Sequence, residues 1–513
     1  MKHLAKIFSA ELDGIEAKII EVEIDINVGL HAFNIVGLAD RATTEAKERV
    51  SSALKNSNVK PPNRENRKIT VNLAPADIKK TGSQYDVAIA VGYLLASNQI
   101  KPFETSDKLF LGELSLDGTV REISGALNFA KLAEREGFRF LFVPRANAEE
   151  AALVAGITVI PLVSMEELMA HLEERVFIDP QPASEFILDD EDDMALAEIK
   201  GQEAAKRALA VAAAGGHHLL FSGSPGAGKT MLARAFVSLL PPPTIDEAME
   251  VTQIWSAAGL MKEFALKRQR PFRSPHHTAS PVSVVGGGAD PRPGEISLAH
   301  NGVLFLDEMP EFRRDLLEAL RQPLESGQVT VARIKSTLTF PARFMLLAAM
   351  NPCPCGYFGD PEKECRCTAN EVFRYQKKIS GPLLDRIDIQ IDVPRVKVED
   401  LRRKVSDADQ SQVRALKEKI RQARRMAEER FGAAEISLRT NSQMSSKNAD
   451  ELVVFDDSGE KFLKSILEKA LVSGRGYYRI LKIARTIADL DQSERVSGAH
   501  LAEAFHYRIR EKE

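Results

Sequence analysis

The sequence predicts a multidomain chain that combines α/β and α+β domains. Its 513 residues exceed what one hydrophobic core can organise, so about three domains are expected. Apolar strands alternate with helices across residues 196–396, which is typical of a parallel sheet covered by helices. Residues 1–175 mix strands with helices, whereas residues 397–513 are mostly helical. We therefore expect an N-terminal α+β domain, a central α/β core and a C-terminal helical lid.

The N-terminal domain is predicted from two kinds of periodicity. Apolar and polar residues alternate in "AKIIEVEIDI" and "RKITVNLAPADI", as they do in half-buried strands. Helix-forming residues at helical spacing fill "DRATTEAKERVSSALKNS" and "GALNFAKLAEREG". Two prolines and an acidic run at 189–193 then mark residues 176–195 as an acidic linker to the core.

The composition excludes few functions, but it indicates the cellular compartment in which the protein is expected. Apolar residues make up 44% and charged residues 28% of the chain, as in ordinary globular proteins. No apolar run is long enough to span a membrane, and the N-terminus lacks the apolar core of a secretory signal. With only four cysteines, we expect a cytoplasmic protein. The net charge of −4 does not exclude a nucleic-acid binder, because charges can be unevenly distributed.

A phosphate-binding loop opens the core. "HHLLFSGSPGAGKTMLARAF" has a glycine, four residues, then Gly-Lys-Thr, placed between an apolar strand and a helix. Glycines let backbone N–H groups surround phosphate oxygens, lysine supplies a positive charge, and the threonine hydroxyl ligates Mg²⁺. The predicted nucleotide-binding residues are Gly223, Ser224, Pro225, Gly226, Ala227, Gly228, Lys229 and Thr230.

Two further strands end in polar residues. "NGVLFLDEMPEF" places Asp307 where a Mg²⁺ ligand is needed and Glu308 where a general base could polarise water. "FMLLAAMN" ends at Asn351, which is suited to orienting that water near the γ-phosphate. We expect these strand ends to meet the P-loop along one sheet edge, so that ATP and Mg²⁺ are the predicted ligands.

The motifs "IKGQEAAKRAL", "GSPGAGKT", "GVLFLDE", "AAMNP", "GPLLDRIDIQIDV", "PFRSPHHTAS" and "NPCPCGY" occur in this order. Together they resemble the ComM family, also called YifB or magnesium-chelatase-like, of AAA+ ATPases. The resemblance covers nearly the whole chain. It implies a homo-hexameric ring with ATP sites at subunit interfaces, an AAA+ core over 196–396 and a magnesium-chelatase-type lid over 397–513.

The resemblance also implies further site residues. Arg386 in "GPLLDRID" matches the arginine finger that completes a neighbour's site, worth roughly 10³–10⁵ in rate. An ion pair with Asp385 or Asp388 is the alternative. Arg475 matches the lid sensor arginine better than Arg479 does. The expected adenine-pocket residues are Ile199 and Gly201.

Two insertions are expected in the core. Residues 270–297 lie where this clade carries its helix-2 insert, and residues 326–344 alternate as a hairpin around "ARIKS". In related rings such a hairpin points into the central channel, where Arg333 and Lys335 would contact DNA phosphates. The alternative is an exposed charged turn. His276 and His277 do not have metal-site spacing and are open to a structural role.

The N-terminal domain resembles the Lon-protease-like (S5-type) fold, on "VNLAPADIKKTGSQYDVAIAVGYLLAS" and the region that follows it. Lon-like peptidases need a serine–lysine pair. Here the serine position falls on Gln84, beside Ser83, and the lysine position falls near Ile123. We therefore expect no peptidase activity and a role in ring assembly or DNA handling.

All four cysteines lie in "NPCPCGYFGDPEKECRC": Cys353, Cys355, Cys365 and Cys367. Four thiolates can hold a structural Zn²⁺, although C-x-C is tighter than the usual spacing. Four reduced thiols in an ordinary loop are the alternative, because disulfides are unusual in the cytoplasm. Zinc would clamp a polar loop that has few apolar residues of its own.

The resemblance implies an ATP-driven hexameric motor that migrates branches of DNA junctions during natural transformation, with branched or single-stranded DNA and recombination proteins as partners. Residues 411–430, with seven basic and three acidic side chains, add weak support. The rival is a protein-remodelling or magnesium-chelatase-type subunit, and a binding-only scaffold is a third possibility. An unfoldase needs an aromatic pore loop, whereas the turn here reads Arg333-Ile334-Lys335.

Overall fold

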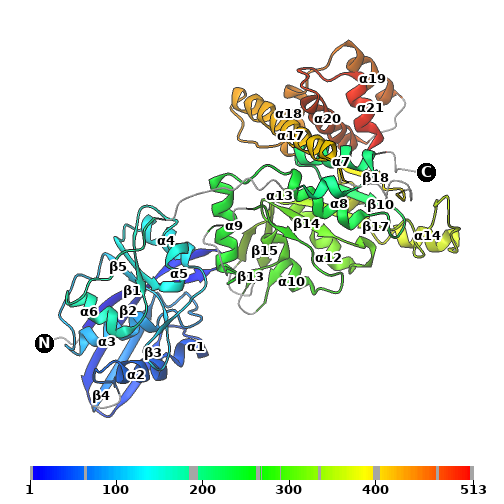
Figure 1. Ribbon diagram of the computed structural model, residues 1–513. Coiled ribbons are helices and arrows are strands. Elements are labelled where there is room, and N and C mark those ends of the chain that lie inside the picture. Colours follow the sequence, from blue (N-terminus) through cyan, green and yellow to red (C-terminus); the bar gives the residue numbers. More distant parts are fainter. Residues whose placement is uncertain are drawn as a thin grey trace.

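The computed structural model describes residues 4–62, 66–183, 194–261, 266, 269–288, 291–332, 337–396, 405–468 and 473–508. Figure 1 shows three bodies, with the α/β core between the N-terminal domain and the helical lid. The acidic run predicted at 189–193 lies outside the described residues, as does half of the predicted linker, residues 184–193.

The N-terminal domain is built on a seven-stranded mixed sheet in the order β3-β4-β2-β1-β5-β8-β9. The long hairpin β1–β2 is antiparallel, and β5, β8 and β9 add to it in parallel. Helix α3 is apolar on all sides and almost wholly buried, so it lies between the sheet and α2. The bounds are β1 (Leu4–Asp13), β2 (Glu16–Val28), β3 (Ala32–Val36), α1 (Arg41–Thr44), α2 (Ala46–Asn56), β4 (Arg67–Ala74), α3 (Asp86–Ala96), β5 (Lys108–Phe110), β6 (Glu113–Leu114), β7 (Val120–Arg121), α4 (Ala126–Arg135), β8 (Phe140–Pro144), α5 (Arg145–Ala151), β9 (Thr158–Leu162) and α6 (Met165–Leu172).

The core is a five-stranded, all-parallel sheet in the order β11-β14-β17-β10-β18. Its strands are short and apolar because helices cover both faces, as predicted from the alternation of strands and helices. The bounds are η2 (Ala195–Glu198), α7 (Glu203–Gly215), β10 (Leu219–Ser222), α8 (Lys229–Phe236), η3 (Val237–Leu239), α9 (Ile245–Ala257), β11 (Phe272–Arg273), α10 (Pro281–Val285), β12 (Gly286–Gly287), β13 (Arg292–Pro293), α11 (Glu295–Leu298), β14 (Val303–Leu306), η4 (Met309–Glu311), α12 (Arg314–Ala319), α13 (Arg321–Ser326), β15 (Gln328–Ala332), β16 (Thr337–Pro341), β17 (Met345–Met350), α14 (Ala369–Gln376), α15 (Gly381–Leu384) and β18 (Ile389–Asp392).

The lid is helical and shares one hydrophobic core with α7 and the sheet. Its longest helix, α17 (Asp407–Ala433), begins at a capping box formed by Ser406 and Asp409. The other elements are η5 (Asn441–Gln443), α18 (Ser446–Leu452), α19 (Asp457–Glu468), α20 (Gly474–Leu490) and α21 (Gly498–His506). Within the described part of the chain, no helix is long and apolar enough to cross a membrane.

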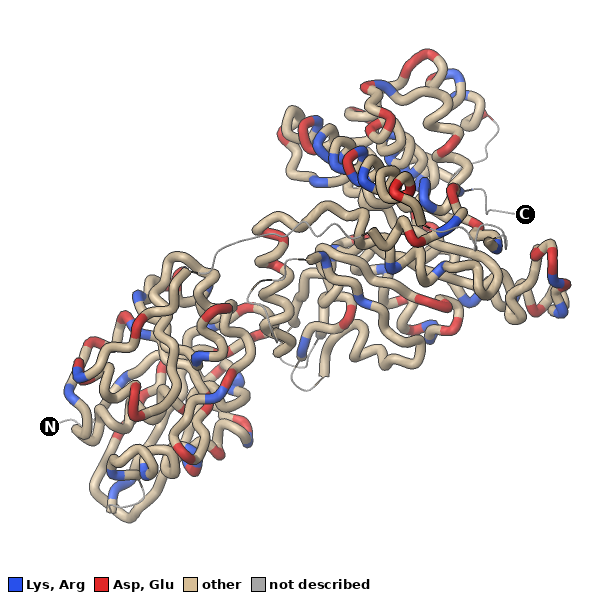
Figure 2. The backbone as a smooth tube through the Cα atoms, viewed as in Figure 1, with Lys and Arg blue, Asp and Glu red and all other residues tan. Residues whose placement is uncertain are grey.

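Basic residues crowd the middle of α17 (Figure 2). Two of them make structural contacts, Arg424 with α7 of the core and Arg430 within the lid. Arg424 donates to the carbonyl oxygen of Ala213 at 2.7 and 3.0 Å, and Arg430 donates to Asn441 at 3.1 Å and pairs with Asp489. The positive charge of this helix is therefore partly structural.

The N-terminal domain contacts the core through α9. Ala248 and Leu266 of the core belong to the hydrophobic cluster that includes Phe129 on α4. The backbone N–H of Gly125 also donates to the carbonyl of Ser256 at 3.1 Å. Figure 1 shows α4 and α5 facing α9. Helix α9 is thus shared between the two domains.

Asp489 is a buried anchor of the lid, with its side chain 0% exposed. It accepts hydrogen bonds from Arg485 at 3.0 Å and Asn441 at 2.8 Å. We expect Asp489→Ala to lower the free energy of local unfolding of α20 by about 3–5 kcal/mol. The substitution would leave the buried guanidinium of Arg485 without its carboxylate partner. Amide hydrogen exchange measures this, with exposed Glu494→Ala as the control. Equal protection in both variants would contradict the expectation.

Candidate nucleotide-binding site

Three neighbouring strands end together at one edge of the core sheet. Strands β10, β17 and β14 are adjacent and parallel, so their carboxyl ends point the same way. The P-loop follows β10, Asn351 follows β17, and Asp307 with Glu308 follows β14. The sheet therefore brings together the residues that the sequence analysis placed at one edge.

The P-loop leaves an open cradle. Gly226 and Gly228 have φ values of 80° and 89°, and a Cβ added to either would meet no atom within 4 Å. The Nζ of Lys229 spans the loop, donating to the carbonyls of Gly223 at 2.6 Å and Ser224 at 3.1 Å. It also donates to Asn351 Oδ1 at 3.0 Å. Burial lowers the pKa of Lys229, because desolvation disfavours the charged ammonium. These three oxygens take all three of its N–H donors, so an anion bound in the cradle would have to replace at least one of them.

A hydroxyl and a carboxylate that could bind Mg²⁺ lie beside this cradle. The Thr230 hydroxyl donates to Asp307 Oδ2 at 2.7 Å, and Asp307 Oδ1 accepts the backbone N–H of Glu308 at 2.9 Å. A hydroxyl and a carboxylate next to a phosphate cradle are the oxygen donors that Mg²⁺ takes in nucleotide sites. Glu308 is exposed and has left-handed backbone geometry (φ 49°), so its carboxylate is accessible to water.

A cavity of about 570 Å³ adjoins the P-loop. Of the two expected adenine-pocket residues, Ile199 lines this cavity and Gly201 does not. Gly201 has φ 62° and makes a turn between Lys200 and Gln202, which both line the cavity. One of these, Gln202, donates to the carbonyls of Ala227 at 3.2 Å and Pro394 at 2.5 Å. Eight lining residues were not predicted from the sequence: Glu198, Lys200, Gln202, Met231, Leu232, Glu362, Arg395 and Val396. Of these, Lys200 and Gln202 lie inside the "IKGQ" motif, and Met231 and Leu232 directly follow the P-loop pattern.

The two predicted arginines lie at the opposite edge of the sheet. A larger cleft, of about 1,590 Å³, is lined by Arg386 and Arg475. Its lining also includes the residues at which the strands begin, such as His218, Gly302 and Met345. The four residues of β10 separate the two edges by roughly 13 Å at 3.3 Å per residue. Arg386 and Arg475 therefore do not join the P-loop of their own chain.

Arg386 is buried and already paired. It forms an ion pair with Glu325 of α13, and its Nη1 donates to the carbonyl of Pro382 at 2.6 Å. The partner is therefore neither Asp385 nor Asp388, the two carboxylates that the sequence analysis considered. Asp388 pairs with Arg479 at 3.7 Å and accepts the backbone N–H of His218 at 3.2 Å. Burial opposes its ionisation, but hydrogen bonding from His217 keeps the pKa of Asp388 below its usual value.

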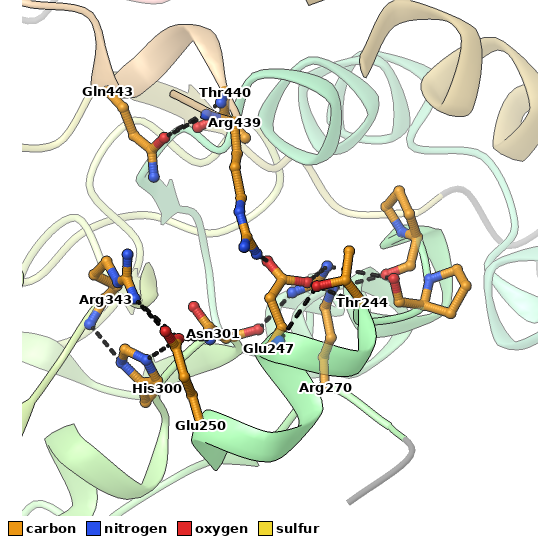
Figure 3. A network of polar contacts seen from close by, with 12 residues as sticks. Thr244, Glu247, Glu250, Arg270, His300, Asn301, Arg343, Arg439, Thr440 and Gln443 are labelled. Atoms are coloured by element: carbon orange, nitrogen blue, oxygen red, sulfur yellow. Dashed lines mark hydrogen bonds and ion pairs between the residues drawn. The ribbon is translucent and has the colours of Figure 1, made fainter. Parts of the chain in front are cut away.

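A polar network ties the lid to α9 along the same cleft (Figure 3). Glu247 of α9 pairs with Arg439 of the lid at 2.7 Å and with Arg270 at 2.8 Å. One turn on, Glu250 accepts from His300 at 3.0 Å and from Arg343 at 2.9 Å. Helix α9, which also contacts the N-terminal domain, thereby holds the position of the lid.

The four cysteines converge in space. In the cysteine loop (residues 351–368), three Sγ–Sγ separations are 3.4–3.6 Å, and all four sulfurs lie within 4.8 Å of one another. A tetrahedral Zn²⁺ with Zn–S bonds near 2.3 Å needs sulfurs about 3.8 Å apart, so the donor set fits a metal ion. Within the loop only Cys353 and Gly356 are buried, so apolar packing alone does not order this segment.

The structure describes parts of the two predicted insertions, residues 270–297 and 326–344. Strands β15 and β16 form the predicted antiparallel hairpin, but Arg333 and Lys335 at its turn lie outside the described residues. The rings of His276 and His277 contact each other with centroids 4.2 Å apart and planes tilted by 33°, and His276 accepts the backbone N–H of Thr278. The pair is thus part of the packing of the insert.

The N-terminal domain contains no serine–lysine pair among its described contacts. The Ser83 hydroxyl donates to Glu113, and the Gln84 amide donates to Glu11 at 3.0 Å. Lys80 is buried and donates to the carbonyl of Pro75. The absence of peptidase activity stays a prediction, and these contacts agree with it.

Comparisons with known proteins cover the whole architecture. The profile described as "Magnesium chelatase, subunit ChlI" matches residues 195–401. "Subunit ChlI of Mg-chelatase" matches residues 22–147, and "Magnesium chelatase, subunit ChlI C-terminal" matches residues 410–508.

Some relatives match over nearly their full length and others over a short stretch. The chain is 40% identical to competence protein ComM of Haemophilus influenzae, over 98% of this chain and 97% of that protein. It is 40% identical to the uncharacterized protein YifB of Escherichia coli, over 96% and 95% of the two chains. A magnesium-chelatase 67 kDa subunit of Chlorobaculum parvum matches 31% of this chain and 23% of its own length at 29% identity. The chain therefore belongs to the ComM/YifB family of magnesium-chelatase-like AAA+ proteins.

Proposed function

We propose that this protein is an ATP-driven hexameric ring that moves DNA, acting on branched or single-stranded structures such as recombination junctions. The observation that carries the ATPase part is the open phosphate cradle, beside which Lys229 contacts Asn351 and Thr230 contacts Asp307. The DNA part is supported by near full-length similarity to a protein named for competence.

Each residue at the P-loop edge has a distinct task. Backbone N–H groups of the loop and Lys229 bind the phosphates, and Thr230 with Asp307 holds Mg²⁺, which neutralises charge on them. Glu308, exposed beside Asp307, takes the proton of the attacking water. Asn351, which contacts Lys229, orients that water.

The separation of Arg386 and Arg475 from the P-loop supports a site shared between subunits. In a ring, the arginine edge of one copy faces the P-loop edge of the next. Arg386 then exchanges its ion pair with Glu325 for the neighbour's γ-phosphate, and Arg475 approaches the same nucleotide from the lid. Hexameric assembly follows from the family resemblance.

The rival function is that of a magnesium-chelatase-type or protein-remodelling subunit. The short match to the Chlorobaculum subunit favours it, since the P-loop chemistry would be the same. The predicted channel hairpin, with Arg333 and Lys335 at its turn, favours DNA instead, because cations suit phosphates better than an unfolded chain.

We further propose that Cys353, Cys355, Cys365 and Cys367 hold one Zn²⁺ as thiolates. Their sulfur separations support it, and none of the four is in a disulfide. A metal would order a loop that has almost no buried side chains.

The decisive experiment compares ATP turnover with and without a four-way DNA junction, scoring junction dissociation in the same reaction. We expect the junction to stimulate turnover and to be dissociated only with ATP. Lys229→Ala should abolish both activities, since it removes the phosphate-binding charge. Turnover that is indifferent to every DNA form tested would reject the DNA motor and favour the chelatase-type function.

A further inference from the structure

The cysteine loop is fastened to the P-loop by a side chain that the mechanism above does not use. Asp360, in the middle of the loop, has a side chain that is 1% exposed. Its Oδ2 accepts the hydroxyl of Ser224 at 2.5 Å, and its Oδ1 accepts the backbone N–H groups of Glu362 at 2.9 Å and Lys363 at 3.0 Å. One carboxylate thus joins the fold of the cysteine loop to the second residue of the P-loop.

Close packing reinforces this contact. A Cβ added to Gly356 would lie 2.6 Å from the Cδ and Cγ atoms of Pro225 in the P-loop. Gly356 has φ 86°, so the chain turns there with no room for a side chain. Its neighbour Cys355 belongs to the sulfur cluster. The residue that packs against the P-loop is therefore the direct chain neighbour of one residue of the sulfur cluster.

The cysteine loop also reaches the nucleotide cavity. Glu362 and Arg395 both line that cavity. Arg395 pairs with Asp360 at 3.1 Å and with Glu362 at 3.7 Å, and its guanidinium lies 5.4 Å from the ring centre of Tyr357. Arg395 follows β18, so the loop connects the P-loop to the segment that leaves the sheet toward the lid.

We propose that the cysteine loop is a metal-dependent wall of the ATP site, in which Asp360 positions the P-loop through Ser224 and Arg395 closes the nucleotide cavity. The proposal rests on the ATP-binding function proposed above. Asp360 and Arg395 are positioning residues, since neither is needed to transfer a proton or a phosphoryl group.

The physical basis is the near absence of a buried core in the loop. Without four sulfur–metal bonds, the segment between Cys355 and Cys365, most of whose residues are exposed, loses its main restraint. Asp360 then leaves Ser224, and the P-loop must be ordered by the nucleotide itself at a cost in affinity. Occupancy of the sulfur site and affinity for ATP are therefore linked.

Nucleotide affinity of the full chain tests the link, measured with a fluorescent ATP analogue and saturating Mg²⁺. Removing the metal with a chelator under reductant, followed by dialysis, should raise the Kd about tenfold, and Zn²⁺ should restore it. Asp360→Asn should raise the Kd by a similar factor while the bound metal, counted by mass spectrometry, stays near one ion per chain.

Matched variants make the result specific. Glu364→Gln makes the same chemical change in the same loop at an exposed side chain, and should leave the Kd unchanged. A Kd that is the same in metal-loaded protein, stripped protein and Asp360→Asn would overturn the inference and leave the ATPase intact. Failure of the metal-loaded wild type to bind nucleotide more tightly than Lys229→Ala would instead reject the proposed function.

Discussion

Arg386→Ala is expected to slow ATP turnover by about 10³–10⁵, because an arginine finger stabilises charge on the transferred phosphoryl group. The variant should still bind ATP, since Arg386 lies at the sheet edge opposite the P-loop. Steady-state turnover and the Kd of a fluorescent ATP analogue separate the two effects. Arg374→Ala, at an exposed position on α14, is the matched control and should be neutral.

Mixing two inactive variants tests whether the arginine acts on a neighbour. Arg386→Ala subunits keep an intact P-loop, and Lys229→Ala subunits keep an intact arginine. In rings assembled at random from equal amounts, about one interface in four joins both intact parts. Turnover should therefore reappear on mixing. Mixtures as inactive as their components would show that Arg386 does not complete a neighbour's site.

Glu308→Gln is expected to reduce turnover by about 10²–10⁴ without weakening ATP binding, because the amide cannot take a proton from water. Asp307, which contacts Thr230, would still be available for Mg²⁺. ATP should therefore remain bound for a long time in this variant, and rings trapped in the ATP-bound state should accumulate.

The control for this prediction is Glu311→Gln, which changes a nearby carboxylate that pairs with Lys378 at the surface. A single-turnover assay distinguishes slow chemistry from slow product release. If Glu308→Gln hydrolysed ATP at the wild-type rate, another group would have to activate the water. If it lost ATP binding, Glu308 would instead be part of the nucleotide cradle.

The P-loop edge of the core was predictable from sequence because its signals are local. The glycine spacing predicts the phosphate cradle. The apolar strands that are followed by Asp307 and Asn351 predict which side chains lie beside that cradle. The rule that parallel strands end at one edge then brings these segments together. The hairpin β15–β16 was predictable for the same reason, since alternation flanks a short polar turn.

Contacts between distant segments were not predictable in this way. Asp360 and Ser224 are 136 positions apart, and nothing in either neighbourhood indicates the other. The motif around Arg386 suggested an ion pair with a neighbouring aspartate, but the observed partner is Glu325 of α13, 61 positions away. Which edge of the sheet the lid covers likewise depends on tertiary packing of α20 against α7, which periodicity does not encode.

A core that carries its phosphate loop on one edge and its arginines on the other has a consequence for dilute protein. If Arg386 completes a neighbour's site as proposed, a lone subunit would bind ATP but would lack the group that makes hydrolysis fast. Specific activity should therefore rise with protein concentration, and ATP hydrolysis should become fast only once enough subunits have assembled. Assembly around the substrate, rather than supply of ATP, would then switch this enzyme on.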